Sequence, residues 1–532
     1  MTNGGPVDQR LWTQRTLALL AALFAWRTLM QCVTPLELCA DEAYYWDWSR
    51  QLDWGYYSKP PMIAWIIAAA TRVGGNSELA IRFPAVLLST IGLWPVFRLA
   101  SSQFDARIGF WTVAAVAATP GMAAMSLLMT IDAPFLCAWA FAVWCAWELL
   151  APEEPEWRWV LPAIASTGLG LLSKQSMLAI FPLTGLWLIL QSSERRKLLS
   201  PKVWTWWAGS LACLTPVLVW NAQHQWITVQ HTGEHFQSKG ATWARQVTWF
   251  AEFWGSHFGV ISPLSCGLMI VLTIGGLLSW TQVDRRVRFL LCLGVVPMLG
   301  VTVLSATQRV QPNWPAGFVL TSFILLGAWG CGECPWRPLG GWSRRWFSAA
   351  VAVGACLTLG VYLVPLTVPN STLAGGPMDP TVRLRGWESL SGQVGAELSS
   401  LREPDHPLLI AATGRGPVSL LAYYLPGQPR VYRWNPTGIV ESQHEVWGGP
   451  NEDRRGADAL IFTHVGQEVP RELAAAFATV ERGTIKESHL GGRRWERLQV
   501  WRGSGYRGWP QISQSSAEFV QTADAAAATK MQ

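Results

Sequence analysis

Long apolar runs separated by short polar connections fill the first 365 positions of this chain. A helix needs about 20 mostly apolar residues to cross the hydrocarbon core of a bilayer. The stretch at 62–73 is shorter, so we expect it to lie along the membrane interface or to join the next helix. By this measure we predict about eleven transmembrane segments, at residues 13–33, 80–100, 109–119, 132–150, 158–173, 175–191, 204–220, 263–281, 288–305, 314–331 and 346–365.

The segment at 109–119 is short for a span and ends at Thr119-Pro120-Gly121. Proline cannot continue a helix without losing a backbone hydrogen bond. We therefore expect this segment to tilt or to continue irregularly.

From about residue 366 the pattern becomes that of a water-soluble domain. Alternating and continuous apolar runs predict two buried strands, a helix and a further strand, at residues 408–412, 459–463, 419–424 and 494–502. The end of the chain is rich in Ser, Ala and Gln, a composition typical of disorder. We predict a mainly α, polytopic membrane domain over 1–365, a small α/β domain over 366–510 and a disordered tail over 511–532.

Composition supports a multi-pass membrane protein, because 50% of the 532 residues are hydrophobic and only 14% are charged. Arg10 and Arg15 precede the first apolar run, as in a signal peptide. No convincing small-residue cleavage site follows, so we interpret the run as an uncleaved first span. The ten Cys are scattered, and Cys331 and Cys334 form a lone C-x-x-C motif without a second pair. They indicate neither a disulfide framework nor a zinc site.

The net charge of +6 concerns topology more than nucleic acid, because Arg and Lys collect in alternate short loops together with Arg10 and Arg15. Such basic loops face the cytoplasm. The N-terminus is therefore predicted to be cytoplasmic, and the domain after residue 365 to lie outside the cytoplasm. The same parity puts further loops on the outer face, at residues 41–61, 118–132, 173–174, 221–262 and 306–313.

Asp41 and Glu42 follow the first span directly and open a short amphipathic segment. A carboxylate at the membrane surface can act as a general base on an acceptor hydroxyl, or can bind a metal. An acid at a helix N-terminus can also simply stabilise the helix dipole. We expect Asp41 to be the functional residue and Glu42 to support or cap the helix.

The stretch Tyr56-Tyr57-Ser58-Lys59-Pro60-Pro61 lies in the same loop. Two prolines fix the backbone after Lys59, which would hold its ammonium and the nearby phenol of Tyr57 in place for a phosphate. A lysine that snorkels to lipid headgroups is the alternative.

Three further charged side chains lie at predicted span ends on the outer face: Asp132, Lys174 and Arg309. Charges at membrane depth are costly unless they have partners, so each is a candidate functional residue. Asp132 could instead cap a helix. Lys174 could pair with a carboxylate or bind an anion, and the Arg309 guanidinium could hold a phosphate with two hydrogen bonds.

The stretch from His231 to His235 matches the H-x-x-E-H pattern of a zinc peptidase, with Glu234 as its acid. Gly233 weakens the helix that this motif needs, and no third ligand is evident. We expect Glu234 or His235 to contact substrate or a metal in a polar loop. No P-loop, Rossmann fingerprint or nucleophile elbow occurs, which argues against nucleotide-driven chemistry.

Together these residues resemble the GT-C superfamily of polyprenyl-phosphate-dependent glycosyltransferases, namely bacterial relatives of the protein O-mannosyltransferases and the lipid A aminoarabinose transferases. The resemblance runs from about residue 17 to residue 315. Its motifs are Asp41-Glu42-Ala43-Tyr44-Tyr45, Tyr57-Ser58-Lys59-Pro60-Pro61, Thr130-Ile131-Asp132-Ala133-Pro134, Gly170-Leu171-Leu172-Ser173-Lys174 and Gln311-Pro312-Asn313-Trp314-Pro315.

The resemblance implies an inverting transfer of a sugar from a polyprenyl phosphate to a lipid, glycan or protein acceptor, at the outer face of a bacterial inner membrane. Asp41 would be the catalytic base, and Lys59 and Arg309 would bind the donor phosphate. Asp132 and Lys174 would organise the loops, with Glu42, Tyr57, Glu234 and His235 in supporting or substrate-binding roles.

The resemblance also bears on cofactors and partners. In some aminoarabinose transferases the residue before the corresponding lysine is acidic, a type that can hold a metal, but here it is Ser58. We therefore expect no required cofactor, with a divalent metal at this site as the alternative. The expected partners are the lipid-linked sugar, its acceptor and membrane lipids, but no nucleic acid.

Two other functions are compatible with parts of this pattern. A transporter or flippase for a lipid-linked sugar also needs intramembrane charges, but such proteins usually contain internal repeats, and we find none here. A membrane zinc peptidase would use the histidine motif and would contain zinc.

Overall fold

A computed structural model describes residues 6–234, 241–334, 336, 339–401, 408–435, 437 and 440–509. The chain forms two compact units. The membrane unit comprises Met1–Val33, Asp53–Gly55 and Lys59–Leu363. The C-terminal unit comprises Thr34–Leu52, Tyr56–Ser58 and Val364–Gln532. The boundary predicted after residue 365 is close to Val364, but the prediction did not include the parts of the first loop that belong to the C-terminal unit.

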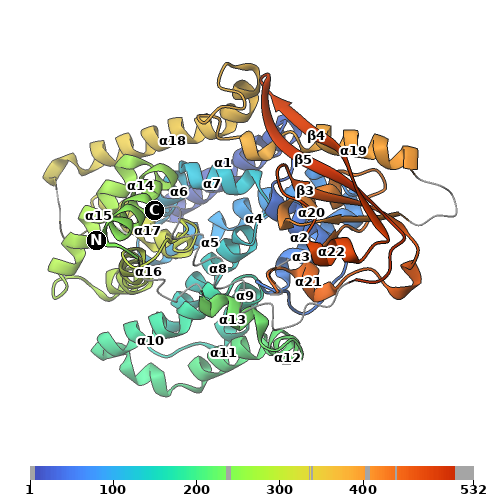
Figure 1. Cartoon of the computed structure of the whole chain (residues 1–532). Coiled ribbons are helices and arrows are strands. Elements are labelled where there is room, and N and C mark those ends of the chain that lie inside the picture. The colour runs from blue at the N-terminus through green and yellow to red at the C-terminus, as the bar shows by residue number, and fades with distance from the viewer. Residues whose placement is uncertain are drawn as a thin grey trace. The chain divides into compact units, whose positions relative to one another are not determined.

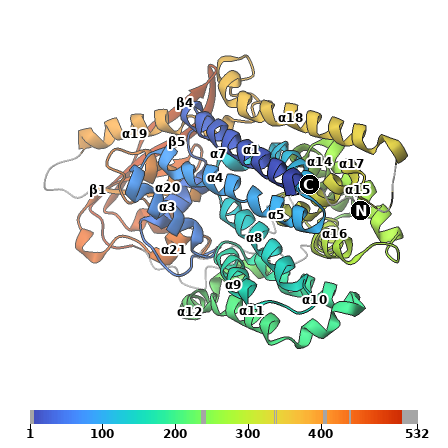
Figure 2. The ribbon, with the colours of Figure 1, turned by 180° about the vertical axis from the view of Figure 1, so that it is seen from behind.

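The membrane unit is a bundle of helices (Figure 1). Its α-helices are α1 (Pro6–Val33), α3 (Met62–Gly74), α4 (Glu78–Ile91), α5 (Leu93–Gln103), α6 (Ala106–Ala117), α7 (Pro120–Leu127), α8 (Asp132–Leu150), α9 (Trp157–Leu171), α10 (Ile180–Leu190), α11 (Pro201–Ala212), α12 (Thr215–Gln223), α13 (Ile227–Glu234), α14 (Trp243–Ile261), α15 (Pro263–Leu278), α16 (Arg285–Ser305), α17 (Ala316–Cys331) and α18 (Ser343–Thr367), of which α18 runs on into the C-terminal unit. Short 3-10 helices cover Gln175–Ala179, Ser192–Leu199 and Gly340–Trp342. The first helix, α1, packs along α4 (Figure 2).

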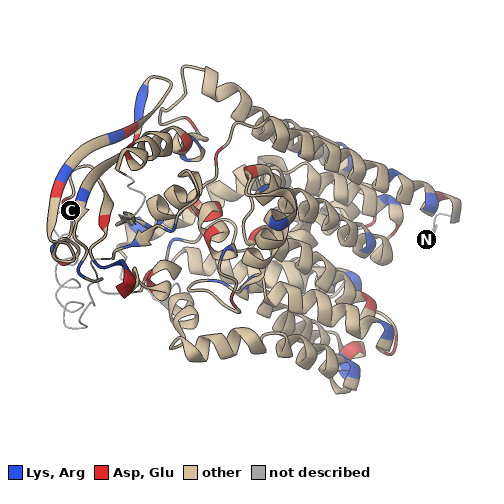
Figure 3. Cartoon of the chain, turned by 90° about the vertical axis from the view of Figure 1, so that its right-hand side faces the viewer, with Lys and Arg blue, Asp and Glu red and all other residues tan. Residues whose placement is uncertain are grey.

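All eleven predicted transmembrane segments are largely helical, but fewer helices are long and apolar enough to cross a membrane. Among the described residues, six helices are long and apolar enough to cross a membrane, and eight if each of two bent pairs is one span. The count is lower than eleven because several of the helices, such as Ala316–Cys331, are shorter than the bilayer core requires. Charged residues lie mainly at the ends of the helices in the bundle (Figure 3). The middle parts of these helices are therefore suited to contact with lipid.

Two breaks interrupt the bundle. The helices α6 and α7 meet at 67° around Thr119, which confirms that the short segment at 109–119 continues irregularly. Residues 221–262, predicted as an outer loop, instead include the whole of α14, which meets α15 at 112°. The apolar stretch predicted at 62–73 forms α3.

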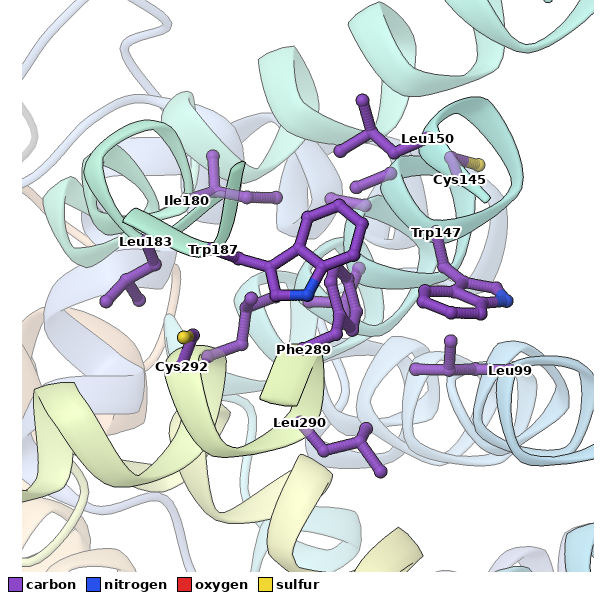
Figure 4. Packing of buried hydrophobic residues seen from close by; sticks show 14 of the residues in the cluster. Leu99, Cys145, Trp147, Leu150, Ile180, Leu183, Trp187, Phe289, Leu290 and Cys292 are labelled. Atoms are coloured by element: carbon purple, nitrogen blue, oxygen red, sulfur yellow. The ribbon is translucent and has the colours of Figure 1, made fainter. Parts of the chain in front are cut away.

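Aromatic side chains hold three helices of the membrane unit together. Trp187 of α10 lies edge-on to Phe289 of α16, with ring centroids 5.3 Å apart. Trp147 of α8 lies 5.1 Å from the same Phe289 ring (Figure 4). The indole N–H of Trp187 donates to the carbonyl of Arg285 at 3.1 Å, so its polar atom is satisfied within the core.

Trp187→Ala is expected to lower the free energy of unfolding by about 3–5 kcal/mol, because it empties a fully buried aromatic site. Thermal unfolding of the purified protein in detergent measures this loss. Trp157→Ala is the matched control, because Trp157 is 57% exposed and exposed substitutions usually cost little. Equal losses in both variants would contradict this assignment of the core.

The C-terminal unit contains one five-stranded sheet of order β2-β1-β3-β5-β4. The strand β1 (Leu408–Ala412) pairs in parallel with β2 (Tyr432–Arg433) and β3 (Asp458–His464), whereas β5 (Arg493–Ser504) pairs antiparallel with β3 and with β4 (Thr479–Leu490). Its α-helices are α2 (Ala40–Ser49), α19 (Trp387–Leu401), α20 (Arg415–Tyr424), α21 (Gln443–Trp447) and α22 (Arg471–Ala475), and short 3-10 helices cover Val368–Asn370, Val382–Leu384 and Glu452–Arg454.

This architecture confirms the predicted α/β domain. The strands predicted at 408–412, 459–463 and 494–502 and the helix predicted at 419–424 are present. The strand β4 was not predicted, and its hairpin with β5 turns through Gly491 and Gly492, which both have positive φ as this tight turn requires. The predicted disordered tail lies outside the described residues.

Candidate active site

The two acids that follow the first span face different environments in the C-terminal unit. Glu42 is fully buried, and its carboxylate accepts a hydrogen bond from the N–H of Cys39 at 3.1 Å, across the first turn of α2. This is the capping role expected for Glu42. The side chain of Asp41 is 51% exposed. The structure therefore leaves Asp41, not Glu42, accessible to a substrate.

Hydrogen bonds to the rest of the C-terminal unit fix the segment around α2. The carboxylate of Glu37 accepts the N–H groups of Gly386 and Trp387, at the start of α19. The phenol oxygen of Tyr44 accepts the N–H of Gln443 at 2.5 Å, and burial raises the pKa of that phenol above its ordinary value. An unfixed loop would not hold Asp41 in one place, so these contacts position the candidate base.

Asp41 pairs with an arginine from another part of the C-terminal unit. The Nη2 of Arg415, the first residue of α20, lies 2.9 Å from the Oδ1 of Asp41. The guanidinium also lies over the ring of Tyr44, 4.9 Å from its centroid. In the described part of the chain, the Oδ2 of Asp41 accepts no hydrogen bond.

The second half of the first loop contributes to both units. Tyr57 belongs to the C-terminal unit and is buried, and its N–H donates to the Oε1 of Gln443 at 2.7 Å. Lys59 belongs to the membrane unit and is half-buried. The turn after Lys59 leads into α3, where the N–H of Met62 donates to the carbonyl of Leu172.

Three residues of the membrane unit form a polar cluster, here called the Asp132 cluster: Asp132 and Lys174, which are buried, and Asn313, which is exposed. The Nζ of Lys174 lies 2.8 Å from the Oδ1 of Asp132 and donates to the carbonyl of Asn313 at 3.1 Å. The side-chain amide of Asn313 donates to the Oδ2 of Asp132 at 2.7 Å. The cluster ties together the start of α8, the end of α9 and the connection before α17. Lys174 therefore pairs with a carboxylate, one of the two roles considered for it from the sequence, and that carboxylate belongs to Asp132.

Arg309 and the described residues of the histidine motif also belong to the membrane unit. The Nε of Arg309 lies 3.0 Å from a carboxylate oxygen of Glu252, in an exposed ion pair. His231 and Glu234 belong to α13, although the side chain of Glu234 is not described and His235 lies outside the described residues. Among the described residues, no group of three His, Cys, Asp or Glu side chains could hold a metal.

A cavity of about 100 Å³ with a mainly apolar lining lies among α4, α5, α7, α8, α14 and α17 of the membrane unit. Its lining includes Met122, Leu320 and Phe323, together with the imidazole of His257. Ala133 and Pro312 also line it, and they are chain neighbours of Asp132 and Asn313. The cavity therefore adjoins the Asp132 cluster, and its apolar lining suits a hydrocarbon group.

Comparisons with known proteins agree with these features. Residues 58–220 match the family described as dolichyl-phosphate-mannose-protein mannosyltransferase, a range that contains Lys59, Asp132 and Lys174. The lipid A galacturonosyltransferase RgtD of Rhizobium johnstonii is 26% identical over 438 residues, which cover 81% of this chain and 86% of RgtD.

Solved structures share the fold. ArnT from Cupriavidus metallidurans, bound to undecaprenyl phosphate, superposes with a TM-score of 0.62 at 16% identity, over 92% of this chain and 98% of ArnT. The archaeal oligosaccharyltransferase AglB from Archaeoglobus fulgidus gives a TM-score of 0.50 at 10% identity, over 84% of this chain and 69% of AglB.

The fold and the sequence relationships define a multi-pass membrane glycosyltransferase. This likeness agrees with the resemblance to polyprenyl-phosphate-dependent glycosyltransferases that the sequence motifs indicate.

Arg415 was not among the residues selected from the sequence. It follows the buried strand β1 in the stretch Thr413-Gly414-Arg415. In α/β domains, ligand-binding residues often follow the carboxyl ends of parallel strands. The position of Arg415 directly after a predicted strand is therefore the sequence feature that could have identified it.

Proposed function

We propose that this protein transfers a sugar from a polyprenyl-phosphate donor to lipid A or a related glycolipid, with inversion at the anomeric carbon, on the non-cytoplasmic face of the membrane. The relative RgtD supports the acceptor by its name, and ArnT supports a donor with a polyprenyl phosphate. The observation that carries the proposal is the carboxylate of Asp41, which is fixed on α2 yet exposed.

In this mechanism the Oδ2 of Asp41 accepts the proton of the acceptor hydroxyl. The hydroxyl oxygen forms a bond to the anomeric carbon of the sugar, while the bond from that carbon to the phosphate oxygen breaks. The electron pair of the broken bond leaves with the polyprenyl phosphate. A base positioned in this way accelerates proton transfer by typically about 10²–10⁴-fold.

Two cations of the membrane unit are proposed to bind the donor phosphate. Lys59 and Arg309 are assigned to the departing phosphate, whose growing negative charge they stabilise. The apolar cavity beside the Asp132 cluster is assigned to part of the polyprenyl chain. We propose that no metal is required, because Ser58 occupies the position where some relatives have an acid and the lysine and arginine already supply positive charge.

The test is a transfer assay with the purified full-length protein in detergent and with EDTA present. Donors carrying labelled galacturonic acid, aminoarabinose or mannose on undecaprenyl phosphate are each offered with lipid A. One labelled, sugar-modified lipid A product is expected. If no donor yields a product with lipid A, glycan or protein acceptors, but vesicles containing the protein translocate the donor, the chain is a transporter instead.

A further inference from the structure

We propose that Arg415 is a positioning residue for the transfer reaction and holds the carboxylate of Asp41 in its working orientation. This inference rests on the proposed function, because it assigns Asp41 as the base. It extends the active site to the domain beyond residue 366. The sequence motifs lie before that domain and assign it no catalytic role.

In the ion pair between Arg415 and Asp41, the two carboxylate oxygens of Asp41 have different roles. Arg415 takes Oδ1 at 2.9 Å, and in the described residues Oδ2 accepts no hydrogen bond. An aspartate at an exposed helix start is otherwise free to rotate about its side-chain bonds. With Oδ1 held, Oδ2 keeps a fixed direction and remains open to an acceptor hydroxyl.

The arginine itself is held in place by packing within the C-terminal unit. Its guanidinium lies over the ring of Tyr44, and such a contact orients a cation over a fixed surface. Tyr44 is buried on the same helix as Asp41. Arg415 therefore contacts both the exposed acid and a rigid neighbour of that acid.

Contacts between α2 and α20 fix the distance between the two charges. The N–H of Leu38 donates to the phenol oxygen of Tyr424 at 2.6 Å, just before α2 begins. Trp46 of α2 packs edge-on against Tyr423 of α20, with ring centroids 5.0 Å apart. Because these helices pack directly, the ion pair does not depend on a flexible loop.

The ion pair between Arg415 and Asp41 contributes little to the stability of the fold. Side-chain exposures of 43% for Arg415 and 51% for Asp41 leave both partners accessible to water. Exposed pairs of this kind contribute little to stability. A selective effect of Arg415 on catalysis can therefore be separated from an effect on folding.

The experiment compares Arg415→Ala, Arg415→Lys and a control, Arg455→Ala, in the transfer assay. Arg455 also forms an exposed ion pair in the C-terminal unit, with Glu452 rather than with Asp41. Arg415→Ala is expected to lower kcat by about 10- to 100-fold with little change in KM, because misplacing a catalytic group costs rate rather than binding. Arg455→Ala should keep the wild-type kcat, and both alanine variants should keep the wild-type Tm.

Chemical rescue separates positioning from a general structural defect. Guanidinium ions at tens of millimolar should restore part of the kcat of Arg415→Ala, whereas Asp41→Asn should not respond. Arg415→Lys should retain more activity than Arg415→Ala, because it keeps a cation near Oδ1.

Two results would overturn the proposal: a wild-type kcat in Arg415→Ala, or a loss that neither guanidinium nor Arg415→Lys relieves. Both presuppose an active wild-type enzyme. Absence of transfer by the wild-type protein would count against the proposed function instead.

Discussion

Asp41→Asn is expected to lower the rate of sugar transfer by about 10²–10⁴-fold, the usual contribution of a general base. The amide has nearly the same shape as the carboxylate but cannot accept the proton of the acceptor hydroxyl. Because Asp41 is exposed and its ion pair contributes little to stability, the variant should fold normally. Initial rates with saturating donor, together with thermal unfolding, measure the two effects separately.

The neighbouring acid supplies the control for this prediction. Glu42→Gln changes a buried residue that caps α2 by accepting the N–H of Cys39. Because the glutamine oxygen can accept the same N–H, the cap is kept, so stability and transfer rate should both stay near the wild-type values, with Asp41 still the proton acceptor. If Asp41→Asn transfers sugar at the wild-type rate, another group must be the base.

The different environments of Asp41 and Glu42 show how much of the site could be predicted from the sequence. The sequence places both acids after a span and at the start of a helix, so a cap and an exposed acid could both be expected there. The capping position three residues after Cys39 is a local property, and local geometry predicted it correctly. The Asp132–Lys174 pair could also be predicted. A charged side chain at membrane depth requires a partner, and few charged side chains at the predicted span ends could serve as one.

Arg415 could not be predicted in the same way, because 374 positions along the chain separate it from Asp41. Its contact with Asp41 depends on the packing of α2 against α20. Periodicity does predict β1 and part of α20, but it carries no information on which remote helix packs there. The number of transmembrane segments is hard to predict for a related reason, because apolar runs can form helices too short to cross the bilayer alone.

Lys174→Met is expected to destabilise the membrane unit by about 3–5 kcal/mol, because it leaves the carboxylate of Asp132 buried without its cation. Both side chains of this pair are more than 90% buried, and Asn313 can satisfy only one carboxylate oxygen. The cluster links α8, α9 and the connection before α17, so transfer should fall together with stability. Thermal unfolding in detergent and the transfer assay measure both losses.

A second variant tests whether charge or packing causes that loss. Asp132→Asn combined with Lys174→Met removes both charges and keeps a carbonyl oxygen that can accept the amide of Asn313, so most of the stability should return. Arg309→Gln is the control for an exposed ion pair and should cost at most about 1 kcal/mol. A double variant as unstable as Lys174→Met would show that the lysine acts through its packing against Phe135, whose ring centroid lies 5.3 Å from its Nζ, rather than through its charge.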